Sequence, residues 1–333
     1  MNILVAGSGG WGTALAMVLY RNGHRVALWS YCAEESESLA KTLRNPFLPG
    51  AELPEDMIFT SDCAQGAEAD MVVFASPSFA VRGTARSFAP YLKENVALVC
   101  VTKGIELGSG LRMSQIITQE TGHPVVSLSG PSHAEEVYKG IPTGVVAACE
   151  DKALAELVQG SFMSESLRVY TCPDVVGVEL GAAHKNVIAL CAGVCDGLGY
   201  GDNTKALLMT RGLAEVARLG MAMGAKRETF AGLAGVGDLI VTCTSMHSRN
   251  RRAGILIGQG MGVQEAMKEV GAVVEGYYAA ESAWELATAN GVEMPITQAA
   301  YEVLYENRKP EQAIHDLMLR HKTSEVEDAA WAR

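Results

Sequence analysis

The spacing of apolar residues changes near position 175 and divides the chain into two parts. Up to Tyr170, short continuous apolar runs alternate with segments of helical spacing. Continuous apolar runs are typical of strands in a parallel sheet that is covered on both faces. After Val175 these runs disappear, and each apolar segment repeats with the period of an amphipathic helix. We therefore expect an α/β domain over residues 1–175 and an all-α domain over residues 176–333.

The apolar runs and the helical segments predict the individual elements. Strands are expected at Asn2–Ala6, Arg25–Trp29, Asp70–Ala75, Ala97–Thr102, Val125–Leu128, Thr143–Ala148 and Leu167–Tyr170. Helices are expected from Gly12 to a left-handed cap at Asn22-Gly23, and at Phe79–Ala89, Leu111–Glu120, Asp151–Ser161, Ala182–Val194, Asn203–Leu219, Asn250–Ile257, Val263–Val270, Glu281–Ala289 and Thr297–Glu306. Because strands and helices alternate in the first part, we expect parallel strand pairing. Tyr31–Pro54 carries Asn-Pro and Pro-Gly turn signals, which predict an irregular loop.

A glycine-rich turn with the spacing of dinucleotide-binding proteins follows the first strand. In Gly7-Ser8-Gly9-Gly10-Trp11-Gly12, glycines occupy the first, third and sixth places of the G-x-G-x-x-G fingerprint. Gly7 allows a tight turn, Gly9 lets backbone N–H groups approach a pyrophosphate, and Gly12 lets the helix pack closely on its strand. The start of that helix would bind phosphate through its dipole and free N–H groups. The motif predicts a Rossmann-type domain with a nicotinamide or flavin dinucleotide, and a glycine turn in another α/β fold is the alternative.

Composition narrows the classes of partner. The 333-residue chain has a formal net charge of -11, which argues against nucleic acid or an anionic membrane as the main partner, because both select basic surfaces. No charged and apolar leader precedes the first strand, and no run of about 18 apolar residues occurs, so we expect a cytoplasmic protein without a membrane span. The eight cysteines are scattered without a C-x-x-C pair. They predict reduced thiols and no metal site.

Lys185 is the strongest candidate for chemistry. It lies in a predicted helix, and its neighbours three and four places away are small or apolar and include no carboxylate, namely Gly181, Ala182, Ile188 and Ala189. If the side chain is buried, desolvation lowers the lysine pKa toward neutrality, which suits a general acid for a carbonyl. The alternative is a long side chain that reaches out to water. Asn186 could orient either the lysine or a substrate.

Three arginines open a later helix, which is unfavourable at the positive end of a helix dipole. The segment runs from Ser245 to Arg252 and places Ser248, Arg249 and Asn250 at the helix start. A phosphate bound there by serine, asparagine, arginine and free N–H groups would reverse this penalty. The alternative is that acids from another helix pair with the arginines.

Further polar residues follow predicted strands, at the edge where α/β sheets bind ligands. They are Lys103 in Thr102-Lys103-Gly104-Ile105-Glu106, and Ser132 and His133 in Ser129-Gly130-Pro131-Ser132-His133-Ala134-Glu135. Taken alone, a lysine such as Lys103 is more often a surface residue, and a histidine such as His133 is more often a residue at a helix start than a catalyst. The glycine-rich stretch from Gly232 to Gly237 predicts a bend that brings Asp238 close to Lys185. A helix-capping role for Asp238 is the alternative.

Together these motifs resemble the bacterial-type NAD(P)-dependent glycerol-3-phosphate dehydrogenases over almost the whole chain. The resemblance rests on Trp11-Gly12-Thr13-Ala14-Leu15-Ala16, Thr102-Lys103-Gly104-Ile105-Glu106, Gly130-Pro131-Ser132-His133-Ala134-Glu135, Lys185-Asn186, Arg211-Gly212-Leu213-Ala214-Glu215, Gly235-Val236-Gly237-Asp238-Leu239 and Ser248-Arg249-Asn250. It implies reversible reduction of dihydroxyacetone phosphate to sn-glycerol 3-phosphate, which supplies the glycerophospholipid backbone. It also implies a homodimer and a small phosphorylated triose as the substrate.

The resemblance assigns roles to individual residues. It implies Lys185 as the catalytic proton donor and acceptor. The implied substrate contacts are Lys103, Gly130, Ser132, Lys185, Asp238, Ser248, Arg249 and Asn250. The implied cofactor contacts, which join the glycines Gly7, Gly9, Gly10 and Gly12 of the fingerprint, are Trp11, Lys103, Ala134, Arg249, Val273 and Glu275.

Two positions depart from the family pattern. Gly10 stands where the family usually has serine, so one side-chain contact to the cofactor is lost. Ser30-Tyr31-Cys32 stands where many members have an arginine that favours the 2′-phosphate of NADP, and it contains no acid that would favour NAD. The preference between NADH and NADPH therefore stays open. A hydroxyacid dehydrogenase of the same two-domain plan and a dinucleotide sensor without turnover are the alternative functions.

Overall fold

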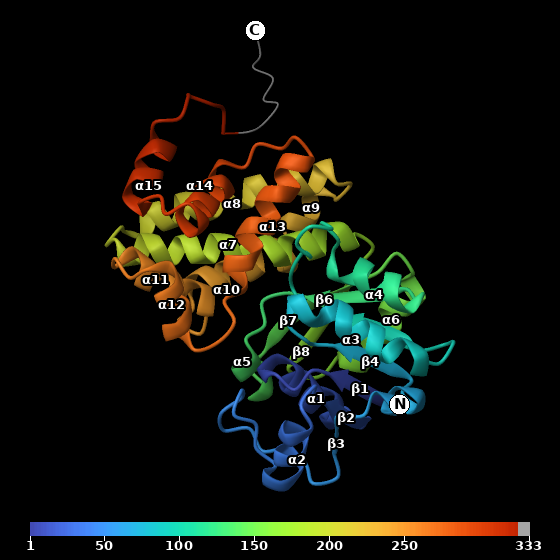
Figure 1. Ribbon diagram of the computed structural model, residues 1–333. Helices are drawn as coiled ribbons and strands as arrows, with labels where there is room; N and C mark the ends of the chain where they lie inside the picture. The colour runs from blue at the N-terminus through green and yellow to red at the C-terminus, as the bar shows by residue number, and fades with distance from the viewer. Residues whose placement is uncertain (326–333) are drawn as a thin grey trace.

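The computed structural model describes residues 1–325, and residues 326–333 of the predicted helical domain lie outside the described residues. The first half of the chain forms one eight-stranded sheet with the strand order β3-β2-β1-β4-β5-β6-β7-β8. Its strands are β1 (Asn2–Ala6), β2 (Arg25–Trp29), β3 (Ile58–Thr60), β4 (Met71–Phe74), β5 (Ala97–Cys100), β6 (Val125–Ser129), β7 (Thr143–Ala148) and β8 (Leu167–Cys172). The predicted fold class, a Rossmann-type sheet followed by helices, is confirmed (Figure 1).

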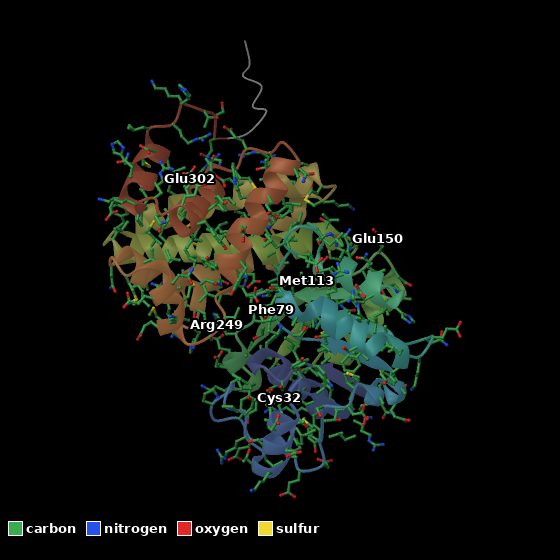
Figure 2. All side chains as sticks on the ribbon, in the orientation of Figure 1. Cys32, Phe79, Met113, Glu150, Arg249 and Glu302 are labelled. Carbon is green, nitrogen blue, oxygen red and sulfur yellow. The ribbon has the colours of Figure 1, made fainter. Side chains whose placement is uncertain are left out.

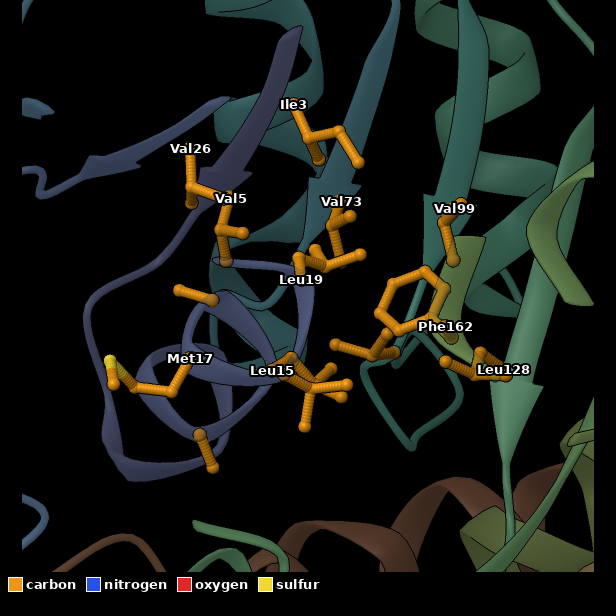
Figure 3. Close-up of a cluster of buried hydrophobic side chains, with 14 of the residues drawn as sticks. Ile3, Val5, Leu15, Met17, Leu19, Val26, Val73, Val99, Leu128 and Phe162 are labelled. Atoms are coloured by element: carbon orange, nitrogen blue, oxygen red, sulfur yellow. The ribbon is translucent and has the colours of Figure 1, made fainter. Parts of the chain in front are cut away.

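Helices cover both faces of the sheet and bury its apolar runs. One face packs against α1 (Gly10–Arg21) and α6 (Lys152–Phe162), and Figure 3 shows Leu15 and Phe162 from these helices pointing at the strand residues Val73 and Val99. The other face packs against α3 (Val81–Phe88) and α4 (Met113–Thr121). Burial on both faces explains why the strands are continuous apolar runs.

Two sequence-based expectations for the first half are wrong. The segment expected as a loop contains helix α2 (Ala33–Thr42), whose only buried residues are Ser36 and Leu39, so it lacks the apolar stripe that reveals a helix. Strands β6 and β7 pair antiparallel. Their connection carries only α5 (Ala134–Tyr138) instead of a full crossover helix, so β7 returns beside β6 in the opposite direction. The three-residue strand β3 was too short to give a pattern.

The second half is helical, as predicted, and surrounds one central helix (Figure 1). This helix, α7 (Val175–Gly197), is longer than the expected Ala182–Val194, because Asp174 caps it by accepting a 2.9 Å hydrogen bond from the Gly177 N–H. Around it lie α8 (Asp202–Ala222), α9 (Arg227–Phe230), α10 (Asp238–Thr244), α11 (Arg249–Gly258), α12 (Val263–Val270), α13 (Glu275–Ala289), α14 (Pro295–Tyr305) and α15 (Pro310–Met318). By length and hydropathy α7 could span a membrane, but 83% of its most apolar stretch is buried inside the protein.

Helices α7 and α11 cross at unusually short range because glycines face each other. A Cβ atom on Gly193 of α7 would lie 2.1 Å from the Arg251 carbonyl oxygen, and one on Gly254 of α11 would lie 2.0 Å from the Leu190 carbonyl oxygen. Gly197 and Gly258, four residues further along each helix, repeat this contact. The crossing sets the position of the start of α11 relative to α7.

Candidate active site

A buried carboxylate between two lysines forms the centre of the site. Lys185 of α7 is 7% exposed, and its ammonium donates to Asp238 Oδ1 and, at 2.7 Å, to Thr242 Oγ1. The Lys103 ammonium donates to Asp238 Oδ2 at 2.7 Å and to the Gly130 carbonyl oxygen at 3.1 Å. The predicted proximity of Asp238 and Lys185 is therefore present, and the alternative of a solvated lysine does not hold.

Burial sets the protonation behaviour of Lys185. Desolvation is the largest effect and lowers the lysine pKa to about 7, opposed by the Asp238 carboxylate and assisted by the positive charge of Lys103. A lysine with this pKa can lose and regain a proton near neutrality. The arrangement can therefore deliver a proton to an oxygen atom that develops negative charge beside it.

Three backbone features bring these residues together. Lys103 follows β5, at the carboxyl edge of the sheet. The π-helical turn Leu233–Gly237 precedes α10 and places Asp238 at the first position of that helix, where its carboxylate turns to the lysines. Gly181 lets the turn approach α7, because a Cβ there would lie 2.7 Å from the Ala234 carbonyl oxygen. The centre therefore lies where the helical half meets the ligand-binding edge of the sheet.

The glycine-rich turn is shaped to hold a dinucleotide. Gly7 has φ of +138°, and a Cβ atom there would lie 2.6 Å from the Ala75 carbonyl carbon. A Cβ on Gly12 would lie 2.0 Å from the Gly7 carbonyl oxygen, which explains the close packing of α1 on β1. A Cβ on Gly9, the N-cap of α1, would meet no atom within 4 Å, and no side chain caps that helix. The open N-terminus of α1 suits a pyrophosphate.

Gly10, the first departure from the family pattern, is close to a loop. A Cβ atom on Gly10 would lie 2.5 Å from the Phe47 carbonyl oxygen and 3.9 Å from the Ala134 Cβ. Asn45 fixes this loop by donating 2.7 Å and 2.6 Å hydrogen bonds to the Ser8 carbonyl and the Thr13 hydroxyl. Trp11 is half-buried and packs against the core under α1. A serine side chain at position 10 would require the loop to move.

The residues after β6 line the same edge. Gly130 has φ of +147°, and a Cβ there would lie 3.0 Å from the Val145 Cα on the neighbouring strand. Its carbonyl oxygen accepts hydrogen bonds from Ser132 Oγ at 3.0 Å and from Lys103. His133 precedes α5, and its Nε2 atom is buried without a hydrogen-bond partner among the described residues. Burial and the charge of Lys185 lower the pKa of His133, which favours the neutral ring.

The start of α11 contributes the third group. The Ser248 hydroxyl caps α11 by accepting from the Arg251 N–H at 3.2 Å. Asn250 donates to Asn186 Oδ1 at 2.9 Å and accepts from the Gly276 N–H at 2.8 Å, so it joins α7, α11 and α13. Arg251 pairs with Asp196 of α7 at 2.8 Å, as the alternative interpretation expected.

Arg249 differs from its neighbours on α11. It is exposed, and none of the hydrogen bonds or ion pairs within residues 1–325 involves its side chain. Figure 2 shows Arg249 and Phe79 at the junction of the two halves of the molecule. The guanidinium group is therefore available to an anion at this junction.

The last two predicted cofactor residues lie near the start of α13. The Glu275 carboxylate accepts from Ser78 Oγ at 2.8 Å, across the junction, and burial raises its pKa. Val273 lines a surface pocket of about 310 Å³ between Gln264 and Tyr278, and none of the other predicted site residues lines that pocket. Sequence reasoning missed Thr242 and Ser78, although Thr242 follows Asp238 by one helical turn, a spacing that places two side chains on one face.

Comparisons with known proteins agree with this geometry. The family model described as the N-terminus of NAD-dependent glycerol-3-phosphate dehydrogenase matches residues 2–155, and the C-terminal model matches residues 174–315. A glycerol-3-phosphate dehydrogenase (NAD(P)+) of Pelotomaculum thermopropionicum is 53% identical over 336 residues, covering 99% of this chain and 96% of the relative. One of Desulfitobacterium hafniense is 51% identical over 330 residues, covering 98% and 94%. The crystal structure of glycerol-3-phosphate dehydrogenase from Coxiella burnetii superposes with a TM-score of 0.92 at 36% identity, covering 96% of this chain and 99% of that one.

The glycine-rich turn and the buried lysine lie at the same edge of the sheet. Together with the matches above, they identify the class of the protein as a nicotinamide-dinucleotide-dependent oxidoreductase. Within that class the matches cover nearly every residue of the chain. The chain belongs to the NAD-dependent glycerol-3-phosphate dehydrogenase family.

Proposed function

We propose that the protein catalyses the reversible NAD(P)H-dependent reduction of dihydroxyacetone phosphate to sn-glycerol 3-phosphate, with Lys185 as the residue that exchanges the proton. The observation that carries this proposal is the burial of the Lys185 ammonium between Asp238 and Thr242 beside the carboxyl edge of the sheet. Bound NAD(P)H would supply the hydride for C2 of the triose.

Lys185 would donate its proton to the C2 oxygen as that oxygen gains negative charge. Asp238 holds the Lys185 amine in place through one carboxylate oxygen, and Lys103 binds the other carboxylate oxygen. The amine therefore does not need to move during the reaction. In the oxidation of glycerol 3-phosphate, the neutral amine accepts the hydroxyl proton. Gly130 and Ser132, next to Lys103, are proposed to contact the triose near its C1 hydroxyl group.

We propose that the start of α11 holds the phosphate group. Arg249 is free to pair with it, and the Ser248 hydroxyl, which uses a lone pair to cap the helix, keeps its hydrogen for donation. Asn250 keeps one amide hydrogen beyond the one given to Asn186. Binding energy from this remote group would align the carbonyl with the dinucleotide.

The phosphate role predicts a clear result for Arg249→Ala. Loss of one charged hydrogen-bond partner should lower kcat/KM for dihydroxyacetone phosphate by roughly 30- to 150-fold. Arg252→Ala is the matched control, because Arg252 is an exposed arginine of the same helix whose side chain, within residues 1–325, donates only to the Val270 carbonyl. Equal kinetic constants for the two variants would exclude Arg249 from the phosphate site.

Substrate choice separates this function from its alternatives. The oxidation of NADH and NADPH is measured with dihydroxyacetone phosphate and, in parallel, with small 2-keto acids. Turnover with the triose phosphate supports the proposal, and turnover confined to the keto acids identifies a hydroxyacid dehydrogenase. Dinucleotide binding without any turnover identifies a sensor.

We further propose that the two domains divide at about residue 175, that the enzyme is a homodimer, and that it works in the cytoplasm. Strand β8 ends at Cys172 and α7 begins at Val175, which supports that division. All eight cysteines are free thiols, which agrees with a reducing compartment. Light scattering on the purified chain tests the homodimer.

A further inference from the structure

We propose that Glu35 makes this enzyme prefer NADH over NADPH. The inference rests on the proposed function, because it assumes that a nicotinamide dinucleotide occupies the glycine-rich turn. The segment Ser30-Tyr31-Cys32 left the choice between NADH and NADPH open. The acid that makes this choice lies just after that segment, in the first turn of the next helix.

The geometry places Glu35 beside the phosphate-binding turn. Strand β2 lies next to β1 in the sheet, so the residues after β2 are adjacent to the turn after β1. Ser8, the second residue of the glycine-rich turn, donates a 2.5 Å hydrogen bond from its hydroxyl to Glu35 Oε1. Glu35 is half-buried in this contact. In dinucleotide-binding sheets, an acid roughly 20 residues after the fingerprint accepts hydrogen bonds from the adenosine ribose.

The local charges oppose a 2′-phosphate. Glu34 and Glu35 both lie in the first turn of α2, where they offset the positive end of the helix dipole. Glu34 accepts a hydrogen bond from the Cys32 thiol at 2.8 Å, which lowers the Glu34 pKa and keeps the carboxylate charged. A ribose hydroxyl can donate to Glu35, whereas a 2′-phosphate would bring about two further negative charges to the same turn.

Basic residues that could compensate are placed elsewhere. Arg44 pairs with Glu52 at 2.9 Å. Lys41 lies in the last turn of α2, six residues beyond Glu35 and therefore about 9 Å further along the helix axis. The chain lacks an arginine from Ser30 to Thr42. The surroundings of Glu35 therefore favour a ribose without a 2′-phosphate.

The experiment measures dinucleotide affinity directly, without triose and without turnover. Kd values for NADH and NADPH are obtained by fluorescence titration of the wild-type protein, Glu35→Gln and Glu37→Gln. We expect the wild type to bind NADH about ten- to a hundredfold more tightly than NADPH. Glu35→Gln removes the charge but keeps an oxygen that accepts from Ser8, so the ratio of the two Kd values should shrink at least about fivefold, mainly through tighter NADPH binding. Glu37→Gln makes the same change at an exposed position of the same helix and should leave the ratio unchanged.

Each outcome decides a separate point. A wild-type protein that binds NADPH as tightly as NADH, or more tightly, overturns the inference and leaves the proposed function intact. An NADH preference that persists in Glu35→Gln also overturns the role of Glu35. A protein that binds neither dinucleotide contradicts the proposed function, and the inference falls with it.

Discussion

The Asp238 carboxylate is shared between Lys185 and Lys103, and this sharing determines how Lys185 can be tested. Asp238 binds both Lys185 and Lys103, one with each oxygen. If Lys185 is removed, the buried carboxylate keeps a partner and does not become an unpaired charge, which would be strongly destabilising. The site can therefore be tested at Lys185 without unfolding the protein.

The first prediction concerns the loss of the amine. Lys185→Met keeps most of the length of the side chain and removes the exchangeable proton, so kcat should fall by about 10²- to 10⁴-fold. The Kd for NADH and the melting temperature should remain close to those of the wild type. Steady-state kinetics with dihydroxyacetone phosphate and with glycerol 3-phosphate measures the effect. Turnover within a few-fold of the wild type would remove Lys185 from the proton transfer.

The second prediction concerns pH. Reduction requires the protonated amine, so kcat/KM for dihydroxyacetone phosphate should fall as pH rises through the Lys185 pKa of about 7. Oxidation of glycerol 3-phosphate requires the neutral amine. Its kcat/KM should therefore show the opposite pH dependence and fall as pH falls through the same value. Profiles from pH 5.5 to 9 in both directions measure it. Parallel profiles in the two directions would contradict the assignment.

At the residue scale, the sequence predicted which residues take part in the chemistry, but it did not predict the long-range hydrogen bonds around them. The apolar neighbours of Lys185 indicated burial, and the glycine-rich stretch before Asp238 indicated the bend that brings the pair together. The Ser78–Glu275 hydrogen bond joins residues 197 positions apart, so only the packing of the two halves creates it. Glu35 was missed because its helix was taken for a loop.

At the scale of elements, the glycines of α7 and α11 decide where the phosphate-binding groups lie. The backbones of the two helices touch at Gly193 and Gly254, and the start of α11 lies less than two turns before Gly254. Any side chain at the crossing would push α11 outward, and Ser248 and Arg249 would move with it.

This geometry gives a third prediction. Gly254→Ala places a Cβ against the Leu190 carbonyl, so the protein should lose about 1–3 kcal/mol of unfolding free energy, and KM for the triose phosphate should rise. Gly160→Ala is the control, because Gly160 is an exposed helical glycine of α6 without a neighbour within 4 Å of its Cβ position. The unfolding free energy of Gly160→Ala should rise by about 0.5–1 kcal/mol. Urea unfolding measures both, and a stable Gly254→Ala with normal KM would contradict the argument.

Elements with a strong apolar period were predictable, and elements held by tertiary contacts were not. Helix α12 was predicted residue for residue at Val263–Val270. Helices α9 and α10 were missed because they are short and follow one another through the π-helical turn Leu233–Gly237. The antiparallel return of β7 has no local signal, because its apolar run suits either direction.

At the scale of the whole molecule, buried polar contacts join the two halves beside the site. Glu179 of α7 is 4% exposed and accepts from the Arg112 guanidinium, from the Ser114 N–H at 2.9 Å and from Ser114 Oγ at 2.6 Å. Both partners lie at the start of α4, which covers the sheet. This contact fixes the helical half against the first half.

The fourth prediction tests this connection. Glu179→Ala leaves the Arg112 guanidinium without its carboxylate partner, and the unfolding free energy should fall by about 3–5 kcal/mol. Glu156→Ala removes an exposed acid that pairs with Lys152 one helical turn away, and it should cost less than about 0.5 kcal/mol. Denaturant titrations compare the two variants. Similar stabilities would mean that the contact between the halves contributes little.

The approach of the Phe47 carbonyl to Gly10 has a consequence for how this sequence can change over generations. A Gly10→Ser mutation would place a Cβ atom 2.5 Å from the Phe47 carbonyl oxygen, so this substitution is disfavoured while residues 45–47 keep their present path. The residue at position 10 and the path of the loop are thus linked, and a side chain at position 10 can be accommodated only after a change in the loop.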